Sequence, residues 1–176
     1  MNTIKIALLG AGTVGSGVVH TLSMNAATIT GRCGAHIEIK KILVRDAKKH
    51  RPEVEGIPLT DSFDEILNDD EISVVVEVMG GIAPAKDYML RAMTAGKHVV
   101  TANKDVIAEH LSELYTVADA NNVDFLYEAS VGGGIPIIKP LKECLTANSI
   151  TEIMGVVNGT TNYMLTKMTE KHVSYD

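Results

Sequence analysis

The sequence predicts an α/β protein built on a doubly wound parallel sheet. Short apolar runs of the kind found in strands buried on both faces alternate with segments of helical periodicity along the 176 residues. The first apolar run ends in a cluster of glycines that leads directly into a helical pattern. Because strands and helices alternate, right-handed crossovers should place the strands side by side in one parallel sheet.

The first two elements are a strand and a helix. Ile4–Leu9 is a short, mostly apolar run that stops at Gly10, as a buried parallel strand does. After the glycines, Val14, Val18 and Leu22 recur every four residues. A helix with this spacing lays an apolar stripe against a sheet.

The next segments continue the alternation. A polar connection over residues 25–36 leads to a second strand at Ile37–Val44, where apolar and polar residues alternate. Ser62–Asn68 is expected to form a short helix, and Ile72–Val78 is a clear third strand.

Two further helix-and-strand pairs follow. Ala83–Ala95 has helical character, ends before Gly96 and leads into a strand at His98–Thr101. A second helix then leads into a strand at Val123–Tyr127. The apolar faces of these two helices are expected at Tyr88, Met89, Ala92 and Met93 and at Ile107, Leu111, Leu114 and Ala118.

The last predicted elements follow the glycine cluster 132–134, which is the best candidate for a domain boundary. Pro136 opens a helix at a position where its missing N–H is harmless. A last strand is expected at Ile150–Val157. The inward face of the helix is expected at Ile137, Ile138, Leu141 and Leu145.

Composition excludes several classes of protein. Lys plus Arg number 16 and Asp plus Glu number 22, giving a net charge of −6 without a basic run, which argues against nucleic-acid and membrane partners. The apolar stretch 6–19 is broken by four glycines, and no window reaches about 18 uninterrupted apolar residues, so neither a signal peptide nor a membrane span is expected. Cys33 and Cys144 lie far apart and outside any C-x-x-C pair, which is typical of reduced thiols in a cytoplasmic protein.

The strongest motif is Gly10-Ala11-Gly12-Thr13-Val14-Gly15, a G-x-G-x-x-G between a predicted strand and a predicted helix. Gly10 permits the tight turn, Gly12 has no Cβ to block a pyrophosphate, and Gly15 lets helix and strand pack closely. The free N–H groups and the dipole of the helix would then face the phosphates. A glycine-rich turn without a nucleotide is the structural alternative, but the placement favours a Rossmann-type dinucleotide site.

The end of the second predicted strand bears on the choice of dinucleotide. An acid there would bind the ribose hydroxyls of NAD, and a base would accommodate the extra phosphate of NADP. Arg45, with Lys48 and Lys49 just beyond it, favours NADP, while Asp46 keeps NAD open. A solvated charged loop is the alternative interpretation.

Three further motifs follow predicted strands, where ligands of open α/β sheets bind. Lys104, after the strand ending at Thr101, could hold a carboxylate or carbonyl oxygen near the nicotinamide, or be a surface lysine. Glu128 and the glycines that follow it suit a hard cation or a plain turn equally well. Residues 158–162 could present N–H and hydroxyl groups to a small polar substrate.

Taken together, these motifs resemble homoserine dehydrogenase over essentially the whole chain. The five matching motifs, in order, are residues 6–15 (IALLGAGTVG), 76–81 (VEVMGG), 101–104 (TANK), 128–136 (EASVGGGIP) and 158–163 (NGTTNY). The resemblance implies NAD(P)-dependent interconversion of L-aspartate 4-semialdehyde and L-homoserine, in threonine, methionine and isoleucine biosynthesis, by a homo-oligomeric enzyme. It implies an NAD(P)-binding Rossmann domain at residues 1–134 and, at 135–176, the incomplete start of an α+β substrate-binding and dimerisation domain.

The resemblance also assigns roles residue by residue. Arg45 with Lys48 or Lys49 would favour NADP, and Lys104 resembles the family's lysine beside nicotinamide and substrate. The coenzyme would lie on Gly10, Gly12, Thr13, Val14 and Gly15. A sodium-type cation would be held by Glu128 and by the backbone of Val131, Gly133 and Ile135. Gly159 and Thr160 would begin the substrate pocket.

One departure from the family concerns the catalytic residues. The family's substrate-binding Glu and its catalytic Asp and Lys lie in a later segment, so these 176 residues are expected to bind coenzyme but to be catalytically incomplete. Two alternatives remain: a non-catalytic NADP-sensing module, and another Rossmann oxidoreductase such as aspartate semialdehyde dehydrogenase. The latter would use a cysteine nucleophile, and Cys144 is expected in mid-helix rather than on an exposed turn.

Overall fold

The computed structural model describes residues 2–156 and 158–174 and divides the chain into two compact units. The first unit is Met1–Ser130 and the second is Val131–Asp176. The boundary predicted after residue 134 lies near this division and stays a prediction. No helix within the described ranges is long and apolar enough to cross a membrane.

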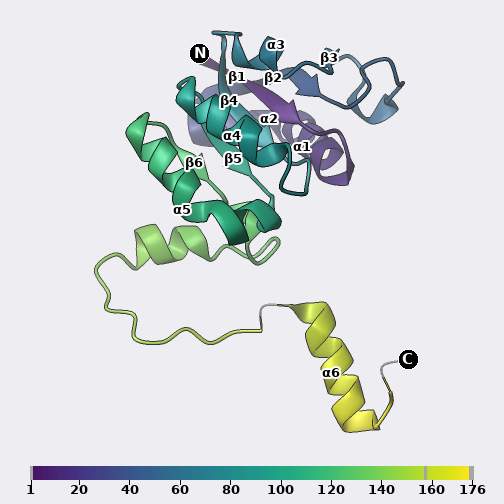
Figure 1. Ribbon diagram of the computed structural model, residues 1–176, viewed down its shortest axis with the longest axis vertical. Helices are drawn as coiled ribbons and strands as arrows, with labels where there is room; N and C mark the ends of the chain where they lie inside the picture. The colour runs from purple at the N-terminus through teal and green to yellow at the C-terminus, as the bar shows by residue number, and fades with distance from the viewer. Residues whose placement is uncertain (1, 157, 175–176) are drawn as a thin grey trace. The chain divides into compact units, whose positions relative to one another are not determined.

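The first unit is built on a six-stranded sheet in which every pair of neighbours is parallel (Figure 1). The strand order is β3-β2-β1-β4-β5-β6, so the direction of winding reverses between β1 and β4. The strands are β1 (Asn2–Leu9), β2 (Ala35–Leu43), β3 (Leu59–Thr60), β4 (Ile72–Glu77), β5 (His98–Thr101) and β6 (Phe125–Leu126). This order confirms the predicted doubly wound sheet.

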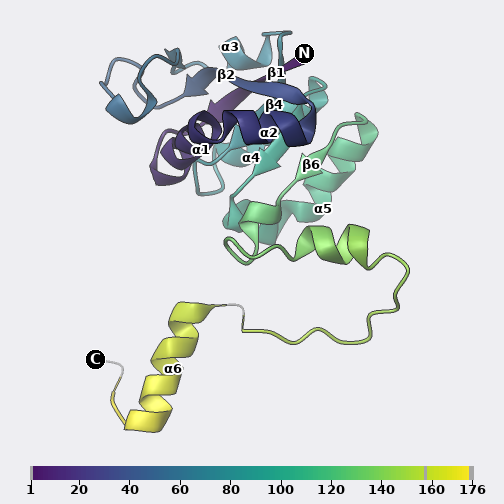
Figure 2. The ribbon, with the colours of Figure 1, turned by 180° about the vertical axis from the view of Figure 1, so that it is seen from behind.

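Helices cover both faces of this sheet. Helices α1 (Thr13–Met24) and α2 (Ala26–Cys33) lie on one face, while α4 (Ala85–Thr94) and α5 (Lys104–Ala120) lie on the other (Figures 1 and 2). Short turns complete the unit: η1 (Pro52–Val54), α3 (Asp64–Leu67) and η2 (Glu128–Ser130).

The core lies between the sheet and these helices. Strand residues such as Leu8, Ile42 and Val75 are fully buried, as the continuous apolar runs predict. The predicted inward faces of α4 and α5 are also largely correct, since Met93 and Leu114 are fully buried. A rigid sheet therefore fixes the ends of β1, β2, β4 and β5, where the loops begin.

Several local predictions for the first unit are wrong. The segment predicted as a polar connection contains α2, an eight-residue helix with no buried residue that ends at Gly34 in a left-handed conformation. The helix was missed because Thr28, Thr30 and Gly31 have low helix propensity. Val14 is exposed rather than part of an inward stripe, and β6 is shorter than predicted.

The second unit holds a π-helical turn, η3 (Pro140–Cys144), and helix α6 (Gly159–Lys171). The regular helix predicted from Pro136 is not seen, and Leu145 is exposed. The strand predicted at 150–157 is also wrong over 150–156, while Val157 lies outside the described residues. A strand needs a hydrogen-bonded neighbour, and none of the six described strands pairs with this segment, whose side chains, such as Met154, are exposed.

Candidate coenzyme-binding site

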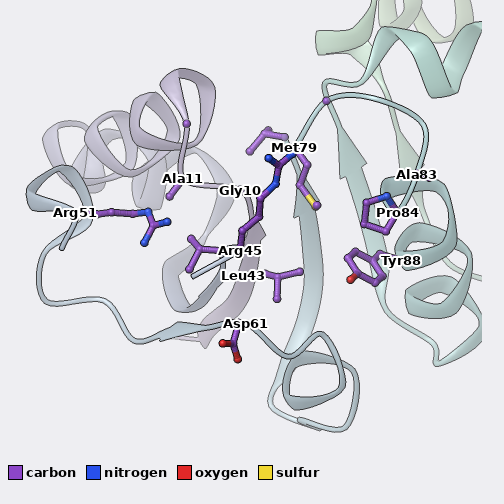
Figure 3. A pocket seen from close by; sticks show the side chains of 14 residues that line it. Gly10, Ala11, Leu43, Arg45, Arg51, Asp61, Met79, Ala83, Pro84 and Tyr88 are labelled. Carbon is purple, nitrogen blue, oxygen red and sulfur yellow. The ribbon is translucent and has the colours of Figure 1, made fainter. Parts of the chain in front are cut away.

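A cavity of about 410 Å³ opens at the carboxyl ends of the strands in the first unit (Figure 3). Loops after β1, β2, β3 and β4 form its walls, together with the start of α4. Its lining residues are Gly10, Ala11, Gly12, Leu43, Val44, Arg45, Arg51, Asp61, Val78, Met79, Gly80, Ala83, Pro84 and Tyr88. The reversal of strand order between β1 and β4 is where open α/β sheets bind ligands.

Two positions at the turn from β1 into α1 accept only glycine. Gly10 has a φ of +107°, and a Cβ on it would lie 3.1 Å from the Val78 carbonyl oxygen. A Cβ on Gly15 would lie 2.2 Å from the Gly10 carbonyl oxygen, a distance that no side chain tolerates. The glycines thus bring the start of α1 directly against the strand ends.

Gly12 serves a different purpose. It is the N-cap of α1 and lines the cavity, and nothing in the described protein lies within 4 Å of where its Cβ would be. The N–H of Ser16 makes the first bond back to the Gly12 carbonyl oxygen at 2.8 Å, which leaves the N–H groups of Thr13, Val14 and Gly15 without a partner inside the helix. This end of α1 therefore presents N–H donors and a positive dipole to an anion.

Two arginines reach the cavity beyond β2. Arg45 directly follows Val44, and Arg51 reaches the cavity from the far end of the loop (Figure 3). The Nη1 of Arg51 donates to the Asp46 carbonyl oxygen at 2.7 Å and to the Lys49 carbonyl oxygen at 3.0 Å. Because a guanidinium has five N–H groups, Nε and Nη2 are left for a ligand.

The loop after β2, which the hydrogen bonds of Arg51 close, places Arg45 at the cavity but not Lys48 and Lys49. Asp46 folds back locally, since its Oδ1 accepts from the Lys48 N–H at 2.9 Å. Lys48 and Lys49 are exposed and are not among the residues that line the cavity. Arg45 does line the cavity. The contact of all three bases with coenzyme stays a prediction.

The wall opposite the arginines is largely apolar. Figure 3 shows Ala83, Pro84 and Tyr88 on that side, across from Arg51. The Tyr88 ring stacks on Phe63 with centroids 4.2 Å apart, which fixes its orientation. An aromatic ring held in a fixed orientation can pack against a planar group such as a nucleotide base.

Lys104 lies at the neighbouring strand end. It is the first residue of α5 and is exposed, and Asn103 caps that helix by accepting from the Val106 N–H at 3.2 Å. Lys104 does not line the cavity described above. Its side chain forms no ion pair with any residue that the structure describes.

The remaining predicted site residues belong to both units and are described separately. Glu128 is half-buried in η2 of the first unit. Val131, Gly133 and Ile135 belong to the second unit, where Gly133 has a φ of +63°. Gly159 and Thr160 open α6, whose N-cap Asn158 accepts from the Thr161 N–H at 2.8 Å. The cation and substrate roles of these residues stay predictions.

Sequence reasoning missed three polar side chains of the cavity: Arg51, Asp61 and Tyr88. Arg51 and Asp61 lie beyond a loop whose path no periodicity reveals. Tyr88 was identified only as part of an inward helix face. A usable signal was present for Arg51 alone, since it is a third base within six residues of Arg45. The position expected for Cys144 is also wrong, because its side chain is exposed at the end of η3.

Fold and cavity together define a dinucleotide-binding domain of the Rossmann class. The family described as "Homoserine dehydrogenase, NAD binding domain" matches residues 10–128, and the family "Homoserine dehydrogenase" matches residues 136–176. The chain belongs to the homoserine dehydrogenase family.

Curated relatives that are homoserine dehydrogenases match this chain over its whole length. It is 45% identical to the homoserine dehydrogenase of Bacillus subtilis over 177 residues, which covers 100% of this chain and 41% of that protein. It is 47% identical to the homoserine dehydrogenase of Synechocystis over 181 residues, covering 99% of this chain and 40% of that protein. The chain therefore spans about two fifths of the length of these relatives.

Solved structures show the same similarity. The homoserine dehydrogenase of Thiobacillus denitrificans matches with a TM-score of 0.91 and 43% identity, over 98% of this chain and 40% of that one. A hyperthermophilic archaeal homoserine dehydrogenase in complex with NADPH matches with a TM-score of 0.79 and 26% identity, over 96% of this chain and 57% of that one.

Proposed function

We propose that this chain is the coenzyme-binding part of a homoserine dehydrogenase. The whole enzyme would be a homo-oligomer that reduces L-aspartate 4-semialdehyde to L-homoserine with NAD(P)H, in threonine, methionine and isoleucine biosynthesis. One observation carries the proposal: the open position of Gly12 at the start of α1, in a cavity at the reversal of strand order. Membership of the family supports the reaction.

We infer that the coenzyme is NADP rather than NAD, from the bases that line the cavity. Arg45 and Arg51 both reach it from the loop beyond β2, where a 2′-phosphate on the adenosine ribose would lie. Two guanidinium groups offer charge-assisted bonds to such a phosphate. Asp61, the acid of the cavity, follows β3 rather than β2, so it does not take the place of an NAD-type acid. The archaeal relative in complex with NADPH is consistent with this choice.

The chain's own residues bind and orient the coenzyme. The bound coenzyme would supply the hydride for reduction of the aldehyde. The N–H groups of Thr13, Val14 and Gly15 hold the pyrophosphate, and Tyr88 and Pro84 provide an apolar wall. Lys104 would place a positive charge beside the substrate oxygen, where negative charge develops.

The remaining proposed sites draw on Glu128, which belongs to the first unit, and on residues between 131 and 160, which belong to the second. Gly159 and Thr160 would meet the substrate through the N-terminus of α6. Glu128 and the backbone of Val131, Gly133 and Ile135 would hold a sodium-type cation, because carboxylate and carbonyl oxygens suit a hard ion.

A glycine substitution tests the coenzyme site. Gly12→Ala should raise the Kd for NADPH about tenfold or more, because the added methyl group occupies the surface on which the phosphates rest. Folding should be unaffected, since nothing in the described protein lies within 4 Å of that methyl group. The measurement is titration of the purified chain with NADPH, followed by the fluorescence of the nicotinamide.

Gly17→Ala is the matched control. Gly17 also lies in α1, also has nothing within 4 Å of its Cβ position, and does not line the cavity. Failure of the unaltered chain to bind NADPH, or equal binding by the two variants, would contradict the proposal. Because the chain spans 41% of the Bacillus subtilis relative, we expect no measurable homoserine oxidation from it alone; rapid turnover would show that the site is already complete.

A further inference from the structure

The most deeply buried acid of the first unit lies at its ligand-binding edge. Glu77, the last residue of β4, has an exposed fraction of 0%. Its Oε1 accepts from the Met79 N–H at 2.7 Å, and its Oε2 accepts from the Thr101 hydroxyl, at the end of β5, at 2.6 Å. Both oxygens are thus satisfied, but by neutral donors, and no described cation pairs with this carboxylate.

These bonds extend into the residues that follow the two strands. The Thr101 hydroxyl accepts from the Asn103 N–H at 3.0 Å, and the Asn103 side chain donates from Nδ2 to the Gly81 carbonyl oxygen at 2.7 Å. The same Asn103 caps α5, whose first residue is Lys104. A closed set of buried and half-buried hydrogen bonds therefore joins the loop after β4 to the start of α5.

A purely structural role explains this arrangement poorly. Burying a carboxylate is costly, and an apolar side chain of similar volume is commonly as stable or more stable at such a place. What the carboxylate achieves is local: it fixes Met79, which with Gly80 lines the cavity, and through Asn103 it fixes the position of Lys104. Costly buried charges of this kind concentrate at sites that need fixed geometry.

The position of the network relative to the coenzyme follows from the strand order. Arg45 and Arg51 mark the β2 side as the adenosine half of the site. A dinucleotide crosses the reversal between β1 and β4, so its other half must extend over the ends of β4 and β5. Glu77, Thr101 and Asn103 lie beneath that half.

Resting on the proposed function, we propose that Glu77 is a positioning residue for the nicotinamide half of the coenzyme. Its carboxylate joins the cavity wall at Met79 to the end of β5, and so sets where the nicotinamide ring and the Lys104 amine lie relative to one another. Glu77 does not line the cavity itself and acts through these neighbours.

The test compares two ligands that differ only in the nicotinamide. Glu77→Gln and Thr101→Val should each raise the Kd for NADPH about tenfold, the effect of one charge-assisted hydrogen bond. The Kd for 2′-phospho-ADP-ribose, which lacks the nicotinamide, should stay within about twofold of the unaltered value. Both ligands are titrated by calorimetry, and Thr101→Ser, which keeps the hydroxyl, should restore NADPH binding.

Lys97→Met is the matched control for lost stability. Lys97 is also buried, precedes β5, and donates from Nζ to the Asp69 and Ile72 carbonyl oxygens, both at 2.8 Å, at the opposite edge of the sheet. The Lys97→Met variant should have a lower thermal midpoint and unchanged Kd values for both ligands.

The inference would be overturned if Glu77→Gln and Thr101→Val weakened the binding of both ligands equally, or weakened the binding of neither. If Glu77→Gln does not fold, Thr101→Val and Thr101→Ser decide the question. An unaltered chain that binds neither ligand would contradict the proposed function instead.

Discussion

The two ends of the parallel strands in the central sheet, the amino edge and the carboxyl edge, differ in the partners of their charged side chains. At the amino edge, beside the start of β4, Lys40 of β2 pairs with Asp69 at 2.6 Å and with Glu71 at 2.5 Å, and Lys5 of β1 pairs with Glu71 at 2.7 Å. At the carboxyl edge, Arg45 and Lys104 form no ion pair with any residue in the described ranges. Within the part of the chain that the structure describes, Arg51 donates to the Asp46 and Lys49 carbonyl oxygens and forms no ion pair.

This difference separates structural charges from functional ones. An ion pair satisfied within the protein has little left to offer a ligand, whereas an unpaired cation beside a cavity attracts anions. Among the described residues, the carboxyl edge combines cations outside any ion pair with the N–H groups of Thr13, Val14 and Gly15, which have no partner inside the helix. We therefore expect the coenzyme at the carboxyl edge and a structural role for the pairs at the amino edge.

The largest expected effect concerns the backbone that shapes the carboxyl edge. Gly15→Ala should destabilise the chain by about 3 kcal/mol, because its Cβ would lie 2.2 Å from a backbone oxygen and overpacking against backbone finds no cheap relief. Urea denaturation followed by circular dichroism measures the change in the free energy of unfolding. The Gly17→Ala control, in the interior of the same helix, should instead stabilise by about 1 kcal/mol. Equal stability of the two variants would mean that α1 does not approach the strand ends as closely as described.

The next effect distinguishes the bases near β2. Arg45→Ala and Arg51→Ala should each weaken NADPH binding about tenfold, and NADH binding by less than about twofold, because only NADPH carries the 2′-phosphate. Lys48→Ala and Lys49→Ala should leave both coenzymes unaffected, since neither lysine lines the cavity. Titration of each variant with both coenzymes provides the measurement.

Arg51 needs one additional variant, because its Nη1 also closes the loop onto the Asp46 and Lys49 carbonyl oxygens. Arg51→Lys keeps the charge and loses the forked geometry, so it should bind NADPH with intermediate affinity. Equal loss of NADH and NADPH in Arg51→Ala would show that Arg51 shapes the loop rather than binding the phosphate. A large effect of Lys48→Ala would restore the sequence-based assignment.

What the sequence could predict depends on how local the cause is. The strands and the glycine turn are encoded by contiguous patterns, so β1, β4, β5 and Gly10 to Gly15 were predicted correctly from short windows. Arg45, two residues beyond the end of β2, lines the cavity, and its contact with coenzyme stays a prediction.

The missed features depend on contacts between distant residues. The network of Glu77 joins residues 24 positions apart, and no periodic pattern indicates such a bond. Arg51 and Tyr88 reach the cavity through a loop path and a helix rotation that a window cannot define. The wrong strand at 150–156 has the opposite cause: an apolar run suits a strand, but a strand forms only where a partner is available.

The smallest expected effect tests the amino edge through pH. Hydrogen bonding from Lys40 lowers the pKa of the Asp69 and Glu71 carboxyls. A carboxyl whose pKa is lower in the folded state contributes stability that is complete above its ordinary value of about 4 and is lost as pH falls through the folded value. Lys40→Met should therefore lower stability near neutral pH and flatten its decline between about pH 5 and pH 2. The effect should be modest, because exposed pairs are screened by solvent. Thermal midpoints across this range provide the measurement.

Lys48→Met is the control, because it removes a lysine that is in no ion pair with a described residue, and it should keep the original slope. Parallel pH profiles for Lys40→Met and the unaltered chain would mean that the amino-edge pairs are not formed in solution, and the contrast between the two edges would then rest on the carboxyl edge alone.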